Sequence, residues 1–82
     1  MKTTALRTHI KAARWAALGN QARAQGLRFD HITKHARAVA EATYPDNAKA
    51  AVAYAALRII IACNSKPTPA DRAALDNALS SS

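Results

Sequence analysis

The chain has 82 residues and a formal net charge of +7, because 12 Lys and Arg residues face only five Asp and Glu residues. A chain of this length builds one small domain with a modest core. Its single cysteine excludes an intramolecular disulfide and a Cys/His zinc framework, and it suits a reducing compartment.

The hydropathy pattern gives no sign of a membrane segment. The longest apolar run, residues 50–63, is interrupted by Arg58 and is too short to span a bilayer. The N-terminal residues contain no apolar block typical of a signal peptide. We therefore expect a cytoplasmic protein without membrane contact, with one helical domain over residues 1–79 and a disordered serine tail over residues 80–82.

The positive charge is concentrated in the first half of the chain. Residues 1–41 hold eight Lys or Arg and two Asp or Glu, whereas residues 42–82 hold four and three. This asymmetry suggests that one half contacts a polyanion while the other builds the core. The alternative is that the charge only keeps the protein soluble.

The composition favours helices throughout. Alanine dominates, glycine is scarce, and β-branched residues cluster only in Ile59–Ile61. Together with the hydrophobic periodicity, this predicts an all-α fold: a compact bundle of four or five short helices, with a helix-turn-helix-like segment at about residues 20–43.

The first predicted helix covers about residues 5–18, with Thr3 or Thr4 as its N-cap. At about 100° per residue, one apolar stripe contains Leu6, Ile10, Ala13 and Ala17. A neighbouring basic stripe contains Arg7, Lys11 and Arg14, with Trp15 beside it. The Gly19-Asn20 pair either ends this helix or only weakens it, since the next residues are good helix formers.

Gly26 is a stronger stop signal, and Asp30 is the predicted N-cap of a second helix from His31 to about Thr43. The inner arc of this helix contains Ile32, Ala36, Val39, Ala40 and Thr43, and the outer arc contains His31, Thr33, Lys34, Arg37 and Glu41. This pattern predicts an amphipathic helix with a polar outer face.

The third predicted helix covers residues 48–63, with Asp46 or Asn47 as its cap after the break at Pro45. It is apolar on nearly all sides. Its apolar positions include Val52, Tyr54, Leu57, Ile59 and Ile61. Such a helix needs cover on both faces, so it is either the central helix of the fold or a dimer seam.

The last predicted helix follows Thr68, its N-cap, with Pro69 at the first helical position and Asp71 in the first turn. It has a short apolar face made by Ala70, Ala74, Leu75, Ala78 and Leu79.

The sequence contains no catalytic constellation. The five carboxylates are scattered, and there is neither a glycine-rich phosphate loop nor an activated nucleophile. Cys63 is interpreted as a small buried hydrophobe. His31 and His35 lie four residues apart, but a metal site needs a third ligand. We expect no enzymatic activity, cofactor, metal or small-molecule substrate.

One segment points to an activity. In a helix-turn-helix, a small residue, a turn glycine and an aliphatic anchor recur at the spacing of Ala22, Gly26 and Ile32. The residues that then face outward, and that suit phosphate or base contacts, are Arg28, His31, Thr33, Lys34 and Arg37. Three polar residues stand where aliphatic ones are more usual: Gln21, Gln25 and His35. The alternative is an ordinary helix-loop-helix in a plain bundle.

The basic stripe of the first helix suggests a second surface. Arg7, Lys11 and Arg14 recur at helical spacing, and Trp15 can stack on a base or a sugar. The alternative is that the arginine stems cover the edge of the core and that Trp15 lies within it. For Trp15 we favour the core.

These features predict a small basic nucleic-acid-binding regulator, and a homodimer through the 48–63 helix is one way in which the second face of that helix would be covered. One alternative is a phage- or plasmid-type accessory protein that inhibits or modulates a host protein or nucleoprotein complex, with its basic face against an acidic protein surface. Another is a subunit of a larger assembly that uses the same apolar helix as its interface.

Overall fold

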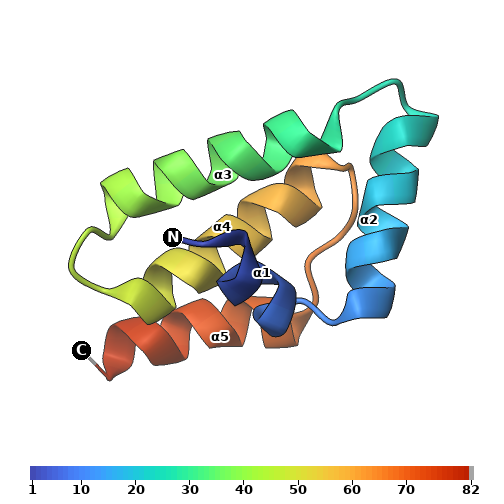
Figure 1. Ribbon diagram of the computed structural model, residues 1–82. Helices are drawn as coiled ribbons and strands as arrows, with labels where there is room; N and C mark the ends of the chain where they lie inside the picture. The colour runs from blue at the N-terminus through green and yellow to red at the C-terminus, as the bar shows by residue number, and fades with distance from the viewer. Residues whose placement is uncertain (82) are drawn as a thin grey trace.

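The computed structural model describes residues 1–81 and folds them into five α-helices without a β-strand in that range. The helices are α1 (Thr3–His9), α2 (Ala12–Ala24), α3 (Phe29–Thr43), α4 (Ala48–Ala62) and α5 (Pro69–Ser80). Helices α3, α4 and α5 form a layer, α1 lies over α4, and α2 runs crosswise at one end (Figure 1). The all-α prediction is therefore confirmed.

Helix α4 is the central helix of the fold, which was one of the two interpretations of its apolar sequence. Its buried residues are Ala50, Ala51, Ala53, Ala55, Ala56, Ile59 and Ile60. It contacts α3, α5 and α1, and it reaches so many neighbours because alanine lets their backbones approach closely. Of the five positions predicted for a core or dimer role, Ile59 is fully buried and Val52, Tyr54 and Leu57 are half-buried. Ile61 remains 57% exposed.

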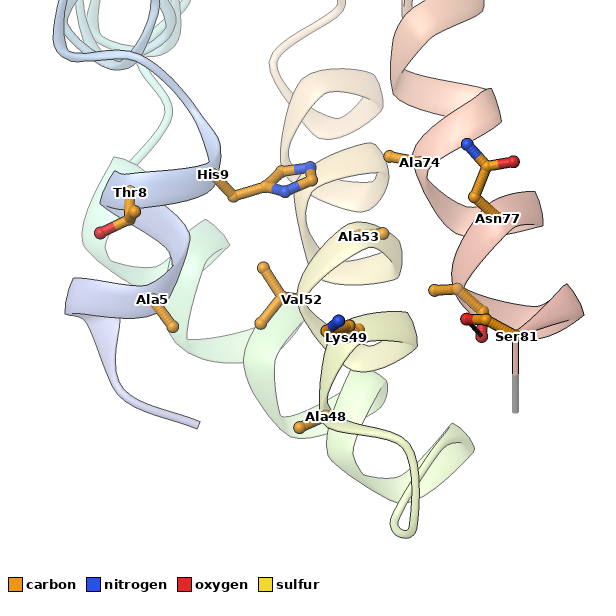
Figure 2. Close-up of a pocket in the computed structure, with 11 residues that line it drawn as sticks. Ala5, Thr8, His9, Ala48, Lys49, Val52, Ala53, Ala74, Asn77 and Ser81 are labelled. Atoms are coloured by element: carbon orange, nitrogen blue, oxygen red, sulfur yellow. Dashed lines mark hydrogen bonds between the residues drawn. The ribbon is translucent and has the colours of Figure 1, made fainter.

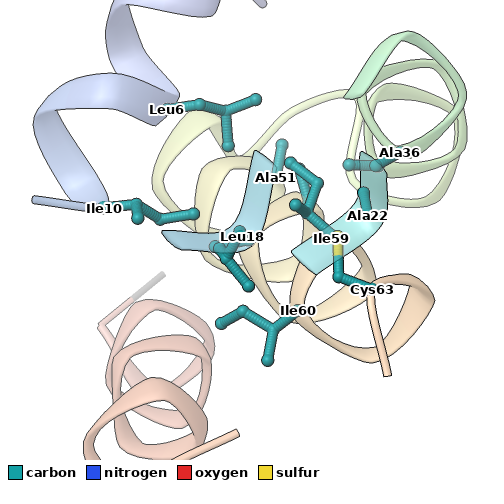
Figure 3. Close-up of a cluster of buried hydrophobic side chains, with 12 residues drawn as sticks. Leu6, Ile10, Leu18, Ala22, Ala36, Ala51, Ile59, Ile60 and Cys63 are labelled. Carbon is teal, nitrogen blue, oxygen red and sulfur yellow. The ribbon is translucent and has the colours of Figure 1, made fainter. Parts of the chain in front are cut away.

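The hydrophobic core lies between α4 and the helices around it. Figure 3 shows Leu6 and Ile10 approaching α4 from one side, with Leu18 of α2 beside them. Ala22 and Ala36 close the cluster from α2 and α3. The remaining members are Ala40, Ala51, Ala55, Ala56, Ile59, Ile60 and Cys63, the last of which is buried as expected.

The prediction of one continuous helix over residues 5–18 was wrong. The chain leaves the helix at Ile10 (φ −95°, ψ 118°) and Lys11 (φ −58°, ψ 149°), and α2 then begins in a new direction. Neither position is a glycine or a proline, so local propensity does not cause the break.

Burial explains this break. On one straight helix, Leu18 and Ala22 would lie about 120° around the axis from Leu6 and Ile10. The structure buries all four side chains against the same core, so the chain has to turn between the two pairs. Two members of the predicted apolar stripe, Ala13 and Ala17, are exposed instead. Once this turn is made, the helix continues through Gly19-Asn20 without interruption.

The predicted stop at Gly26 is confirmed. Gly26 has φ +74°, the left-handed conformation that favours glycine. Its N–H donates to the Arg23 carbonyl (3.0 Å), and the Leu27 N–H donates to the Ala22 carbonyl (2.9 Å). These two bonds are the Schellman pattern, so the direction in which the chain leaves α2 is fixed by hydrogen bonds.

The start of α3 differs from the prediction. The helix begins at Phe29, and Arg28 occupies the N-cap position without a side-chain capping bond. Asp30 lies inside the first turn, where a carboxylate is favoured by the helix dipole but does not cap the chain end. The packing of half-buried Phe29 is the physical reason, because its ring lies edge-on against Trp15 with centroids 5.1 Å apart.

The last two helices begin as predicted. The Asn47 side chain accepts from the Ala50 N–H (3.1 Å) at the start of α4. Thr68 and Asp71 form a reciprocal capping box at the start of α5, with Pro69 at its first position. Helix α5 includes Ser80, and Ser82 of the predicted tail lies outside the described residues.

Because Gly19 and Gly26 have different backbone conformations, we expect alanine substitution to have opposite effects on stability at the two positions. Gly26→Ala should lower the free energy of unfolding by about 1–2 kcal/mol, because a Cβ there is strained by the positive φ although no atom lies within 4 Å. Gly19→Ala should raise it by up to about 1 kcal/mol, since a Cβ inside α2 would make ordinary contacts at 3.4–3.5 Å. Urea unfolding of the two variants measures both changes. Equal effects would contradict the assignment of Gly26 as the chain reversal.

Candidate nucleic-acid interface

The first half of α3 presents a cluster of basic side chains to solvent. We call it the α3 cationic face and define it by Arg28, His31, Lys34 and His35, all of which are exposed. The face exists because the opposite side of the helix is buried against α4 and α2 through residues such as Ala36 and Ala40. Helix α3 lies at one edge of the molecule, so no other helix within residues 1–81 covers its outer side (Figure 1).

The charges on this face are only partly balanced. Arg28 Nη2 lies 3.1 Å from Asp30 Oδ2, and both side chains are 67% exposed, so this pair contributes little to stability. Desolvation opposes ionisation of Asp30, but the hydrogen bond and charge of Arg28 outweigh it and keep the pKa of that carboxyl below its usual value. Lys34, His31 and His35 form no ion pair within residues 1–81.

Two of the predicted outward residues do not belong to the face. Thr33 is only 8% exposed, and its hydroxyl donates to the Asp30 carbonyl at 3.0 Å. The prediction that it projects outward was wrong, because Thr33 shares the buried side of the helix with Ala36 and Ala40. Arg37 is half-buried on the flank beside the N-terminus, where its Nη1 donates to the Met1 carbonyl at 3.5 Å.

The basic stripe predicted from the first helix is not formed as one surface. The break at Ile10 places Arg7 on α1 and Arg14 on α2, with Lys11 between the two helices. Arg7 and Lys11 are exposed, but Arg14 is committed to a different partner. Its two terminal nitrogens each lie 2.7 Å from an Asp71 oxygen.

The Arg14–Asp71 pair connects the start of α2 to the start of α5. The carboxylate is 14% exposed and also accepts the Thr68 N–H at 2.7 Å within the capping box. These hydrogen bonds, with that from Arg14 the largest influence, outweigh desolvation and lower the pKa of Asp71 to about 2. Arg14 is therefore a structural residue rather than a free cation of a binding surface.

Trp15 and the glutamines also have structural roles. Trp15 is half-buried and packs on the core, as favoured from the sequence. Gln21 Nε2 donates to the Asn64 carbonyl (3.1 Å) and Gln25 Nε2 donates to the Cys63 carbonyl (2.9 Å). The two residues that fit a helix-turn-helix poorly therefore satisfy carbonyl groups at the C-terminal end of α4.

Arg58 of α4 lies near the α3 cationic face. The sequence alone did not indicate that this cation belongs to the same surface. Arg58 lines a small hollow between α3 and α4 together with His31 and His35. The one signal in the sequence is that Arg58 interrupts the longest apolar run.

A larger groove of about 530 Å³ lies between α1, α4 and α5, away from the α3 cationic face (Figure 2). Its floor is made largely of alanine and Val52, and its polar lining includes His9, Lys49 and Asn77. No carboxylate of the described chain lines it, so it does not present a paired acid and base.

Neither a clustered metal-ligand set nor a membrane-spanning helix is found in the described part of the chain. Among residues 1–81, no three His, Cys, Asp or Glu side chains are grouped so that they could hold a metal ion. Within the same range, none of the helices has the length and apolar character needed to cross a bilayer.

Comparisons with known proteins return no family model, no curated protein and no solved structure that matches this chain.

The Arg14–Asp71 pair predicts a pH dependence of stability. Because folding lowers the pKa of Asp71 from 3.8 to about 2, the stabilisation is fully present above about pH 4 and is lost as the pH falls toward 2. It amounts to about 2 kcal/mol at most. Urea unfolding at pH 7 and pH 3 of the wild type, Arg14→Gln, Asp71→Asn and the double variant measures it. A coupling energy near zero at pH 7 would contradict the pair, and Asp76→Asn, at an exposed position of the same helix, is the control.

Proposed function

We propose that the protein binds nucleic acid through the α3 cationic face. The observation on which this proposal depends is the grouping of Arg28, Lys34 and two histidines on the solvent side of one helix, next to Arg58 of α4. Guanidinium, ammonium and imidazole groups are donors to phosphate oxygens, and arginine and lysine also recognise guanine edges.

The local geometry suits a helix that contacts a nucleic acid. Ala22 is buried, Gly26 adopts the left-handed conformation and Ile32 packs partly on the core, which are the roles these positions have in a helix-turn-helix. The Schellman bonds after α2 and the Trp15–Phe29 contact hold the start of α3 in place. A rigid helix at the edge of the molecule binds at a lower entropic cost than a mobile segment.

The dimer expected from the sequence has less support than the monomeric surface. Helix α4 buries most of its apolar side chains within its own chain. A second copy of the protein is therefore hardly needed to shield this helix from water. What remains accessible is an edge that includes Ile61 and half-buried Leu57. We therefore propose that a single chain binds the nucleic acid, and that the protein regulates processes on the nucleic acid to which it binds.

The proposal predicts that affinity for nucleic acid falls steeply with salt. Phosphate contacts from Arg28, Lys34 and Arg58 correspond to a slope of about −2.7 in log affinity against log salt, or a loss of about fortyfold between 50 and 200 mM. Fluorescence polarisation of a labelled DNA duplex and of a labelled single-stranded RNA measures this slope. Absence of binding to both at 50 mM salt would contradict the proposal and favour the acidic protein partner.

Lys34→Gln tests the location of the surface. It should reduce the magnitude of the salt slope by about one unit, because one phosphate contact is lost. Arg72→Gln is the matched control, since Arg72 is an exposed cation on α5, at the opposite edge of the layer (Figure 1). It removes the same charge, so equal losses in the two variants would show that only net charge matters.

A further inference from the structure

The hollow between α3 and α4 combines donors from two helices. It has a volume of about 280 Å³ and is lined by His31, Ile32, His35, Ala36, Arg58 and Ala62. The two histidines are one helical turn apart on α3, and Arg58 faces them from α4. The other lining residues are apolar, and the described lining contains no carboxylate. Its polar chemistry is therefore made of groups that donate to an anion.

Arg58 is held in this position by an aromatic side chain. Its Cζ lies 5.7 Å from the centre of the Tyr54 ring, and its Nη1 donates to the Tyr54 hydroxyl at 3.3 Å. Tyr54 in turn packs edge-on against Tyr44, with centroids 5.5 Å apart. The aromatic contacts restrain the guanidinium without neutralising it.

Arg58 differs from the two arginines that form ion pairs. Arg14 and Arg28 each pair with a carboxylate, whereas Arg58 has no carboxylate within 4.0 Å in the part of the chain that the structure describes. A half-buried cation in the apolar C-terminal half of α4 lowers stability unless something compensates it. An external anion would supply that compensation.

We propose that this hollow binds one phosphate group of the nucleic-acid backbone, with Arg58, His31 and His35 as its donors. The inference rests on the proposed function and extends the binding surface from α3 onto α4. Arginine suits the position because its planar guanidinium presents several N–H donors, so it can bind a phosphate while keeping its bond to Tyr54.

Arg58→Gln is the first test of this site. The salt slope for the DNA duplex should fall in magnitude by about 0.9, and affinity at 100 mM salt should fall about three- to tenfold. Arg58→Lys should keep the slope, because the charge remains, while losing part of the affinity. Arg72→Gln should change neither quantity. Thermal unfolding followed by circular dichroism verifies that each variant is folded, and Arg58→Lys serves as the test if Arg58→Gln is not.

A titration with inorganic phosphate separates a free anion from a backbone phosphate. The imidazole NMR signals of His31 and His35 should shift on adding the duplex at concentrations where inorganic phosphate shifts them little. Loss of these shifts in Arg58→Gln supports the site. Larger shifts with inorganic phosphate than with the duplex would overturn the backbone assignment and indicate a site for free phosphate.

The outcomes also separate this inference from the proposed function. If the wild type binds the duplex and Lys34→Gln weakens binding while Arg58→Gln does not, the α3 cationic face is supported and the hollow is rejected. If the wild type binds neither DNA nor RNA, the proposed function and the backbone-phosphate site both fail.

Discussion

Close packing against the alanine-rich surface of α4 is the constraint on which the structure depends. Alanine at positions 51, 55 and 56 presents almost no side-chain bulk, so α1, α3 and α5 can all contact one helix of 15 residues. The chain has few large hydrophobic residues, and close approach of backbones replaces side-chain volume as the source of dispersion contacts. Polar interactions then fix the orientation of helices that the small alanine side chains of the core do not fix by themselves. Arg14–Asp71 fixes α2 against α5, and the glutamines of α2 fix it against the end of α4.

Much of this architecture follows from local sequence patterns. The Gly26 turn, the Asn47 cap and the Thr68–Asp71 capping box involve residues within a few positions of one another, so their chemistry is visible in the sequence. The break after Ile10 is different, because no helix-breaking residue marks it. The break allows Leu6 and Ile10 on one side, and Leu18 and Ala22 on the other, to be buried in the same core. The stripe predicted from the sequence included Ala13, which is exposed, and it left out the second pair.

The positive charge of the candidate site could be predicted from the sequence, but the full set of residues that form the site could not. Lys34 and His31 are exposed as the helical periodicity indicates, whereas Thr33 faces inward because α3 is covered by two neighbours rather than one. The commitment of Arg14 to Asp71 depends on residues 57 positions apart, which no local pattern reveals. The approach of Arg58 to α3 is likewise a property of the tertiary packing.

The division of α3 into a buried and an exposed side has a consequence for how such a protein can diversify. Two exposed positions of its second half, Ala38 and Ala42, take no part in the core, and a substitution there changes the outer surface without changing how α3 meets α4. Glu41, also exposed, pairs instead with the amino group of Met1. By contrast, enlargement of an alanine on α4 would displace several helices together. Substitutions can therefore accumulate on the outer side of α3, while the buried alanines of α4 remain under strict steric control.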